Sequence, residues 1–352
     1  MKNELPAVAL IFGGRGYEHD VSVMGARFLY PKINGARYNK IPVYITKDGE
    51  WITPTDTQES IDGLVERTCK YTEVAPAYLT GEGGLLGRLG FTPIRAAIPL
   101  LHGDFGEDGI VQGALENAKI HYVGCDTSCG AITADKAYAK LIAEHLGIKT
   151  VPFILSVDEE LTSAQHRAEA KLSYPMFIKP ARLGSSIGAR AVNSPEEFGD
   201  CYAEAARLGR GRVLIEEKIP IHRELECAYF AGKSKDIFTL PGEIRLESGS
   251  YDYDTKYSKD STARICERAE IDEKTANELV SQAKKLVRFL GVRDLSRIDF
   301  FLSESGELYF NEINTFPGFT EASLYARMLK LYGIPTDLLV EHLIDEAIAR
   351  RE

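Results

Sequence analysis

The chain has 352 residues, of which 44% are hydrophobic and 27% charged, a length and composition that suit two or three globular domains. Its 42 Lys and Arg against 52 Asp and Glu give a net charge of −10, which argues against non-specific nucleic-acid binding. No apolar stretch approaches the ~20 residues of a membrane span, and no export signal is evident, so we expect a cytoplasmic protein with free thiols that binds no membrane.

Residues 1–125 form the first expected domain, in which buried strands alternate with helices. Three short apolar runs predict its strands: residues 7–12, 41–45 and 96–101. The turn after the first strand is not a dinucleotide-binding fingerprint, because Arg15 and Glu18 stand where G-x-G-x-x-G counted from Gly13 requires glycine. Glu18 lies close to the start of the next helix and is suited equally to hold a ligand ammonium group or to cap that helix.

The loop after the third strand is a second place where we expect a ligand. Residues 102–109, HGDFGEDG, contain three acidic residues and three glycines. Loops at strand ends in α/β folds commonly contact ligands, although a solvated turn has the same composition. Among the histidines, we consider only His19 and His102 as candidates for a site, because they lie in or beside these two turns.

Residues 126–218 are expected to form a second domain that contacts phosphate groups. A helix is predicted at residues 134–146, with a buried face made of Tyr138, Leu141, Ile142, His145 and Leu146. Two strands follow at residues 175–180 and 213–217. After Lys179 the chain reads PARLGSSIG, whose glycines allow backbone N–H groups to approach phosphate oxygens while the lysine adds charge. This is not a Walker A motif, and a plain surface turn remains the alternative.

Residues 219–352 form the third expected domain. Its apolar spacing predicts a long helix at residues 273–290 with one core-facing side. Residues 251–257, YDYDTKY, are too polar for a core strand. An exposed loop is the simplest interpretation of this segment, and the alternative is a lid that brings Lys256 and Tyr257 to a ligand.

The most informative segment is a predicted hairpin near the C-terminus. Alternating apolar residues around Ser305-Gly306 predict two antiparallel strands joined by a two-residue loop, with Asp299 opposite Glu312. The same face is expected to pair Arg297 with Asn314 and Phe301 with Phe310. The other face is expected to hold Ile298, Phe300, Leu302, Tyr309 and Ile313. Opposed like charges destabilise a sheet unless they are neutralised, which a divalent cation bound by Asp299, Glu312 and Asn314 would do; an ordinary solvent face is the alternative.

Seven motifs follow one another over nearly the whole chain: residues 12–22, 102–113, 135–136, 179–188, 251–257, 297–299 and 311–318. In this order they resemble the D-alanine–D-alanine ligase family of ATP-grasp enzymes. The resemblance implies an α/β, three-domain ATP-grasp fold with an N-terminal Rossmann-like pre-ATP-grasp domain. It also implies ATP-dependent joining of two D-alanines through an acyl phosphate for peptidoglycan synthesis. Mg²⁺, replaceable by Mn²⁺, is the metal that we expect, and a homodimer is the expected assembly.

The resemblance further implies roles for individual residues. Catalysis is assigned to Glu18, Ser185, Tyr257, Arg297 and Gly318. ATP binding is assigned to Lys136, Lys179, Ser186, Glu224, Lys256 and one or both of Glu216 and Glu217. The two D-alanines are assigned to Glu18, His102, Ser323 and Leu324. The metal is assigned to Asp299, Glu312 and Asn314.

One stretch departs from the family pattern. After Pro317-Gly318 the family usually has a run like Thr-Ser-His-Ser, whereas residues 320–323 of this chain read TEAS. Because the change lies beside the expected pocket for the second substrate, a D-alanine–D-serine ligase is the main alternative. A non-catalytic ATP-binding protein is disfavoured, because the residues that the chemistry needs are present. A nicotinamide-dependent oxidoreductase is disfavoured, because the glycine fingerprint fails.

Overall fold

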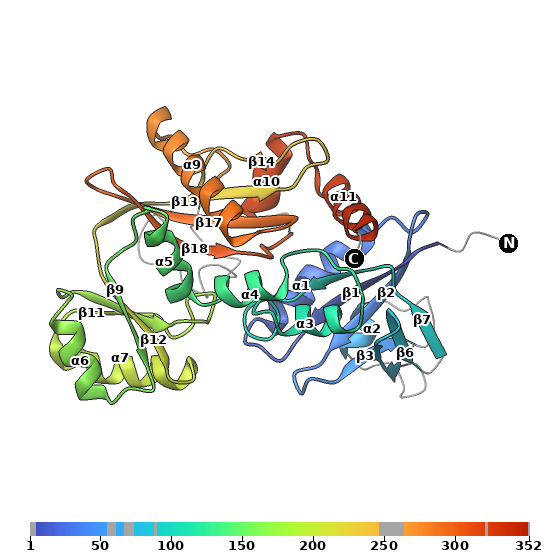
Figure 1. The fold of residues 1–352 in the computed structure, drawn as a ribbon, viewed down its shortest axis with the longest axis horizontal. Helices are drawn as coiled ribbons and strands as arrows, with labels where there is room; N and C mark the ends of the chain where they lie inside the picture. Colours follow the sequence, from blue (N-terminus) through green and yellow to red (C-terminus); the bar gives the residue numbers. More distant parts are fainter. Residues whose placement is uncertain are drawn as a thin grey trace.

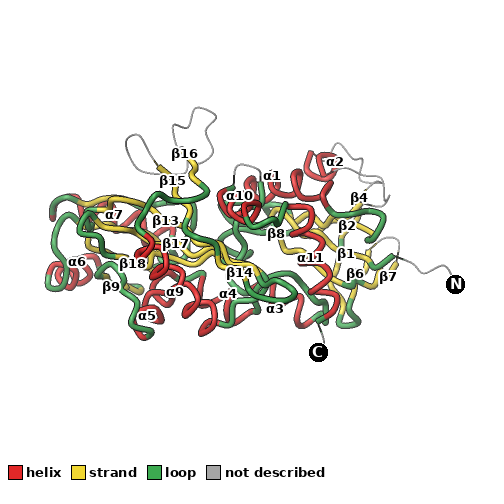
Figure 2. The backbone as a smooth tube through the Cα atoms, turned by 90° about the horizontal axis from the view of Figure 1, so that it is seen from above, coloured by secondary structure: helices red, strands yellow, loops and turns green. Residues whose placement is uncertain are grey.

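The computed structural model of the protein describes residues 5–54, 61–66, 74–87, 90–245, 264–320 and 323–350. Three regions, each built around a sheet, form an elongated molecule with the N-terminal strands at one end and the central strands at the other (Figure 1). Seen from above, the C-terminal sheet lies between these two ends (Figure 2). Within the described ranges, none of the helices combines the length and apolar character needed to cross a membrane.

A five-stranded sheet builds the N-terminal region in the order β4-β3-β2-β1-β8. Its strands are β1 (Ala7–Gly13), β2 (Asn39–Ile45), β3 (Trp51–Pro54), β4 (Val74–Pro76) and β8 (Ala96–Leu100). β1 is parallel to β2 and β8 and buried along its length, which explains its unbroken apolar sequence. The three predicted strands are therefore confirmed to within two residues. The region also contains α1 (His19–Leu29), η1 (Tyr30–Lys32), α2 (Ile61–Glu66), α3 (Ile110–Asn117) and a small sheet of β5 (Tyr78–Thr80), β6 (Gly84–Gly87) and β7 (Gly90–Pro93).

The central region is a four-stranded antiparallel sheet with its own hydrophobic core. Its strands are β9 (Phe153–Val157), β10 (Met176–Pro180), β11 (Arg190–Val192) and β12 (Arg212–Glu217), packed with α6 (Leu161–Glu169) and α7 (Pro195–Leu208). It is preceded by α4 (Thr127–Thr133) and α5 (Lys136–His145). The predicted strands of this region are confirmed. The predicted helix begins at Lys136, because the carboxylate of Asp135 accepts hydrogen bonds from the N–H groups of Ala137 and Tyr138 and so caps it.

The buried face predicted for α5 is wrong. Tyr138 and Leu141 are 40% and 51% exposed, whereas the residues that point inward are Ala137, Ala139, Lys140 and Ala143. The small alanine side chains allow the helix to approach β18 closely, and the buried Lys140 pairs with the carboxylate of Glu216 on β12. Apolar spacing alone therefore assigned the wrong side of this helix.

The C-terminal region is a six-stranded sheet in the order β16-β15-β13-β17-β18, with β14 paired to β13. Its strands are β13 (Ile221–Phe230), β14 (Ile237–Phe238), β15 (Gly242–Arg245), β16 (Arg264–Cys266), β17 (Leu295–Ser303) and β18 (Leu308–Asn314). Its helices are α9 (Glu273–Leu290), α10 (Leu324–Leu331) and α11 (Thr336–Ala349). The predicted helix at residues 273–290 is confirmed, and the apolar face of α9 packs against this sheet.

One hydrophobic cluster joins the N-terminal and C-terminal regions. It combines residues of β1 and β8 with residues of α10 and α11, among them Phe12, Leu100, Tyr325 and Leu343. At its edge the carboxylate of Asp345 accepts hydrogen bonds from Tyr38 and Arg37. These two regions are thus held together by a shared core, while the core of the central region is separate. The proposed division at residues 125 and 218 stays a prediction.

The β17–β18 hairpin differs from its predicted form at two places. Its loop has three residues instead of two, since the N–H of Ser303 bonds to the carbonyl of Glu307 and Gly306 has a φ of +82°. This brings Phe310 opposite Phe300, so the predicted faces of Phe310 and Tyr309 are exchanged. A bulge at Asn311 then shifts the register back. As a result, Asp299 lies opposite Glu312 and Arg297 opposite Asn314, as predicted.

Candidate active site

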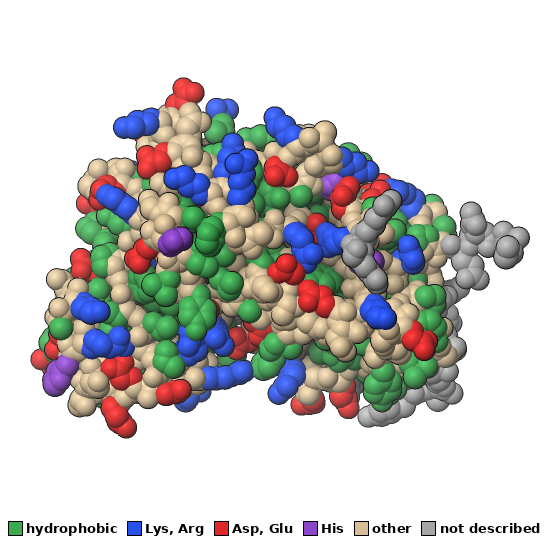
Figure 3. Space-filling model, viewed as in Figure 1, with side chains coloured by type: hydrophobic (Ala, Val, Ile, Leu, Met, Phe, Trp, Pro, Cys, Tyr) green, Lys and Arg blue, Asp and Glu red, His purple; other side chains and the backbone are tan. Residues whose placement is uncertain are grey.

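A cleft of about 1690 Å³ opens where the three regions meet. In the space-filling view, the surface is notched between its two lobes, where acidic and basic side chains gather (Figure 3). The described residues of the expected site all line this cleft: Glu18, His102, Lys136, Lys179, Ser185, Ser186, Glu216, Glu217, Glu224, Arg297, Asp299, Glu312, Asn314, Gly318, Ser323 and Leu324. Lys256, Tyr257 and Glu321 lie outside the described residues.

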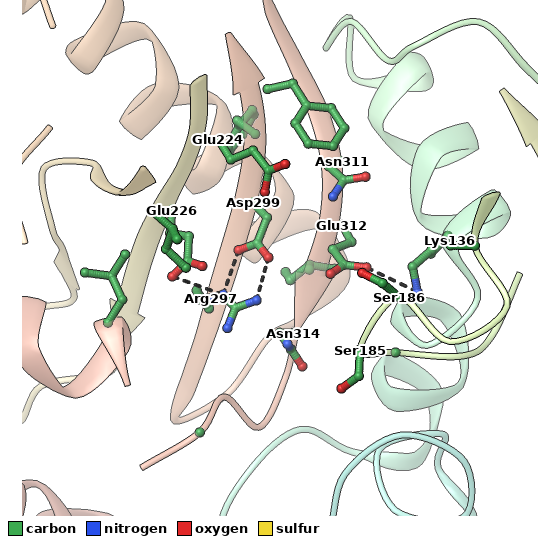
Figure 4. A pocket seen from close by; sticks show the side chains of 18 of the residues that line it. Lys136, Ser185, Ser186, Glu224, Glu226, Arg297, Asp299, Asn311, Glu312 and Asn314 are labelled. Carbon is green, nitrogen blue, oxygen red and sulfur yellow. Dashed lines mark hydrogen bonds and ion pairs between the residues drawn. The ribbon is translucent and has the colours of Figure 1, made fainter. Parts of the chain in front are cut away.

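The opposed carboxylates of the hairpin are neutralised by cationic side chains of the protein itself. Arg297 donates from Nε and one terminal nitrogen to the two oxygens of Asp299, at 2.8 and 2.6 Å. Lys136 places its Nζ 3.2 Å from Glu312 (Figure 4). Burial lowers the pKa of Lys136, but the charge of Glu312 outweighs this effect and raises it. The two carboxylates are therefore opposed as predicted, and Arg297 and Lys136 balance their charges.

The same side chains offer oxygen donors to a metal ion. In the part of the chain that the structure describes, no cluster of three or more His, Cys, Asp or Glu side chains suited to a metal occurs. A metal at the hairpin would therefore depend on two carboxylates, Asp299 and Glu312, and on the amide oxygen of Asn314. This all-oxygen set fits a hard divalent cation such as Mg²⁺ better than a thiolate- or imidazole-seeking metal.

The glycine-serine loop between β10 and β11 lies against Glu18. The hydroxyl of Ser185 donates to a Glu18 oxygen at 2.5 Å, and Glu18 makes no side-chain cap to α1. A Cβ atom at Gly103 or Gly184 would come within 2.3 or 2.8 Å of the Glu18 carboxylate, so a side chain at either position would displace this carboxylate. Of the two roles considered for Glu18, side-chain capping of α1 is wrong, and the role in binding a ligand stays a prediction.

The loop itself is held in an uncommon backbone conformation. Ser185 and Ser186 both have positive φ, 51° and 58°, a region that residues other than glycine seldom adopt. Lys136 secures the loop, since its N–H bonds to the carbonyl of Ala181 and its Nζ to that of Leu183 at 2.7 Å. The start of α5 and the loop thus form one unit at the edge of the cleft.

A buried carboxylate between two lysines lies deeper in the cleft. Glu216 is 2.8 Å from Nζ of Lys140 and 2.7 Å from Nζ of Lys179. Burial raises the pKa of Glu216, but the two lysines together lower it to about 2. Glu217, the other residue considered for ATP binding here, is not part of this cluster. Its carboxylate accepts a hydrogen bond from the N–H of Ser173 at an exposed position. Lys140 is fully buried and was missed, because its neighbours in the sequence gave no sign that it points inward.

Of the two histidine candidates, only His102 faces the cleft. Its Nδ1 lies 3.7 Å from Glu107, and the two side chains are 9% and 16% exposed. Burial lowers the pKa of His102, but Glu107 and Glu18 raise it above its ordinary value. His19 is 3% exposed and bonds to the carbonyl of Gly14 and the hydroxyl of Tyr44 within the N-terminal region.

The segment after β18 forms the remaining wall. Gly318, Ser323 and Leu324 line the cleft, and the hydroxyls of Thr320 and Ser323 lie 2.9 Å apart. Glu226 on β13 is a second residue that was missed. It lies 3.4 Å from Nε of Arg297 and was not expected, because only the pairing of β13 with β17 brings it beside the hairpin.

Two antiparallel sheets meet across the cleft, with Lys179 on one and the opposed carboxylates Asp299 and Glu312 on the other, an arrangement that fits an ATP-grasp fold. Family models agree: the D-ala D-ala ligase N-terminus matches residues 7–125 and the D-ala D-ala ligase C-terminus matches residues 142–345. The chain belongs to the D-alanine–D-alanine ligase family.

Named relatives and solved structures are similar over nearly their whole lengths. The D-alanine–D-alanine ligase of Chlorobium phaeovibrioides is 36% identical, covering 97% of this chain and 96% of the relative. That of Lactococcus lactis subsp. cremoris is 33% identical, covering 96% and 95%. The VanG D-Ala:D-Ser ligase from Enterococcus faecalis superposes with a TM-score of 0.86 at 32% identity, covering 98% of this chain and 100% of that one. The D-alanyl-alanine synthetase A of Vibrio cholerae gives 0.84 at 27% identity, covering 98% and 99%.

Proposed function

We propose that this protein is an ATP-dependent ligase that joins two D-alanines into D-alanyl-D-alanine for peptidoglycan synthesis. The observation that carries the proposal is the meeting of three groups in one cleft: the opposed Asp299 and Glu312, the loop at Ser185, and Glu18. The full-length similarity to ligases of this name supports it. We expect the enzyme to act in the cytoplasm as a homodimer.

Asp299, Glu312 and Asn314 are the residues that would hold Mg²⁺, or Mn²⁺ in its place. The metal would neutralise charge on the β- and γ-phosphates of ATP during phosphoryl transfer. Lys136 lies at the hairpin, where it would contact phosphate oxygens, and Lys179 would reach them from the end of β10. Other residues assigned to ATP are Ser186 in the loop, Glu216 near the adenine, Glu224 at the ribose and Lys256 beyond the described residues.

The chain's own residues would orient the first D-alanine and keep water from the intermediate. Glu18 would bind its ammonium group, and the Ser185 loop would cover the reacting carboxylate. One carboxylate oxygen attacks the γ-phosphorus while the bond to ADP breaks. The deprotonated amine of the second D-alanine then attacks the acyl carbon, and phosphate leaves. Arg297 and the N–H of Gly318 would stabilise the negative oxygen that develops in this second step.

The second substrate is the finer question. The TM-score of 0.86 to a D-Ala:D-Ser ligase makes D-serine the competing acceptor. Ser323 and Leu324 line the cleft where this substrate would bind, and His102 would contact the first one. The sequence pair Lys256-Tyr257 resembles that of ligases that make D-alanyl-D-alanine, and this resemblance favours D-alanine as the second substrate.

One assay tests the proposal. Purified protein is incubated with Mg-ATP and D-Ala, with and without D-Ser or D-lactate, and phosphate release and products are measured. We expect D-alanyl-D-alanine as the main product at neutral pH, and E312Q should lose turnover by about 100-fold or more while keeping its far-UV circular dichroism, since one of two metal-binding carboxylates is removed. Absence of D-Ala-dependent phosphate release would overturn the ligase proposal, and a D-Ala-D-Ser majority would change the acceptor. Full activity of E312Q would exclude the metal assignment.

A further inference from the structure

Three carboxylates lie in a row across three neighbouring strands of the C-terminal sheet. Glu226 on β13 pairs with Asp299 on β17, and Asp299 pairs with Glu312 on β18. Side chains at paired positions lie on the same face of a sheet, with Cβ atoms about 5 Å apart. In Figure 4, Glu226 is on one side of Asp299 and Glu312 on the other. Three adjacent negative charges at this spacing destabilise the sheet unless nearby cations neutralise them, so the positions of those cations matter for the function of the row.

Arg297 is shared between two members of this row. It holds both oxygens of Asp299, at 2.8 and 2.6 Å, and its Nε is also 3.4 Å from Glu226. The side chains of Arg297 and Glu226 are only 20% and 10% exposed, so water screens this contact weakly. Lys136 serves the far end of the row, at Glu312. The guanidinium therefore has two carboxylate partners, one on the metal side and one away from it.

The proposed reaction needs Asp299 and Arg297 for different tasks. A metal at the hairpin must contact the oxygens of Asp299 that Arg297 now occupies. A divalent cation also repels the guanidinium, which must nevertheless stay in the cleft to face the oxyanion. Glu226 lies on the side of Arg297 away from Glu312, where it can keep the guanidinium in place without competing for the metal.

We propose that Glu226 is a positioning residue that takes over Arg297 when metal-nucleotide binds, which frees Asp299 for the metal and keeps the guanidinium in the cleft. The inference rests on the proposed function, since it assigns Asp299 to metal and Arg297 to the oxyanion. It concerns how Arg297 is shared, and Glu226 itself touches neither metal nor substrate. A direct metal ligand or a purely structural carboxylate at this position would behave differently.

The test measures Mn²⁺–ADP binding without turnover, by calorimetry and by the electron paramagnetic resonance of free Mn²⁺. E226Q keeps the size and hydrogen-bonding oxygen of the side chain but removes its charge. We expect it to weaken Mn²⁺–ADP binding about tenfold, because Arg297 then stays on Asp299, and to lower kcat by a similar factor. ADP binding without metal should be unchanged. E226D, which restores the charge, should recover most of both losses.

Two comparisons separate the alternatives. E243Q is the matched control, because Glu243 is 2% exposed on the neighbouring strand β15 and pairs with Arg223 at 3.2 Å. In an R297M background, where no guanidinium competes for Asp299, E226Q should have no further effect on Mn²⁺–ADP binding. An equal loss in that background would make Glu226 a metal ligand and overturn the inference.

A loss in E226Q no greater than in E243Q would make the role of Glu226 structural and would also overturn the inference. The result is independent of the assay for the ligase reaction. Failure of the wild-type protein to release D-Ala-dependent phosphate would overturn the proposed function, while the Mn²⁺–ADP comparison would still decide the role of Glu226. Circular dichroism of each variant establishes that it folds before binding is compared.

Discussion

Removing the charge of Glu216 should destabilise the protein by about 3 kcal/mol at neutral pH. The carboxylate is buried between Lys140 and Lys179, and although burial raises its pKa, the two lysines lower it from 4.5 to about 2. At about 1.4 kcal/mol per pH unit, this difference contributes about 3 kcal/mol to folding. E216Q loses that contribution and leaves two buried ammonium groups 2.8 and 2.7 Å from a neutral amide. The estimate agrees with the ~3–5 kcal/mol typical of breaking a buried ion pair.

K140M is the informative partner variant. It removes one of the two cations and leaves Lys179 paired with Glu216 at 2.7 Å, so the charge of the carboxylate is still balanced. We therefore expect a smaller loss of about 2 kcal/mol, within the range for a hydrogen bond to a charged group. Both variants are measured without ligand by urea unfolding, followed by circular dichroism and by the fluorescence of Trp51, because coincident curves establish a two-state transition. A K140M loss equal to or greater than that of E216Q would refute the charge balance on which this reasoning depends.

The dependence on pH gives the same prediction a second test. A carboxylate whose pKa is lowered by folding stabilises the protein fully above its unfolded pKa of 4.5. As the pH falls from there to about 2, the wild type should lose this advantage, because Glu216 takes up a proton first in the unfolded and then in the folded chain. E216Q has no such group, so the gap between the two proteins should close in acid. A constant gap down to pH 3 would contradict the lowered pKa.

Two further predictions concern the contact between regions and the cysteines. Arg210 of the central region lies 3.6 Å from Asp104 and over the ring of Phe105, both in the N-terminal region. R210A should raise KM about fivefold, because loss of this contact weakens the association of the two regions around the substrate by about 1 kcal/mol. R190A, which breaks the contact of Arg190 with Glu204 within the central region, is the control, and an unchanged KM for R210A would contradict the role. Burial raises the pKa of Cys227 to about 12, so at pH 8 native protein should leave it unlabelled by a thiol reagent, while the partly exposed Cys266 reacts, as mass spectrometry can map. Rapid labelling of Cys227 in the native protein would contradict the burial of its thiol.

Local patterns in the sequence were sufficient for much of the fold. The apolar run of β1 and the spacing along α9 each reflect how one element buries its side chains, and both were predicted within two residues. The α5 helix shows where this fails. A pattern of large apolar residues marks the buried face only when the partner surface has room for them, and here β18 comes so close that alanines and Lys140 face inward.

The hairpin shows the same division within a single site. Two features of the hairpin were not predicted, the loop of three residues and the bulge at Asn311. Their shifts in register cancel, so the pairing of Asp299 with Glu312 was predicted correctly although the loop was not. Bulges depend on what a strand packs against, and the strand's own residues do not reveal them.

The sequence by itself determined the chemistry that the chain carries: the glycine-serine loop, the lysines, the acidic hairpin and their order are local facts. Only the tertiary structure decided how those charges are balanced. Arg297 on Glu226, Lys136 on Glu312 and Lys140 on Glu216 are partnerships set by which strands and helices lie side by side. A buried charge needs a partner in space, and that partner can lie anywhere along the chain. This is why Glu226, invisible as a site residue in the sequence, emerges once β13 is placed beside β17.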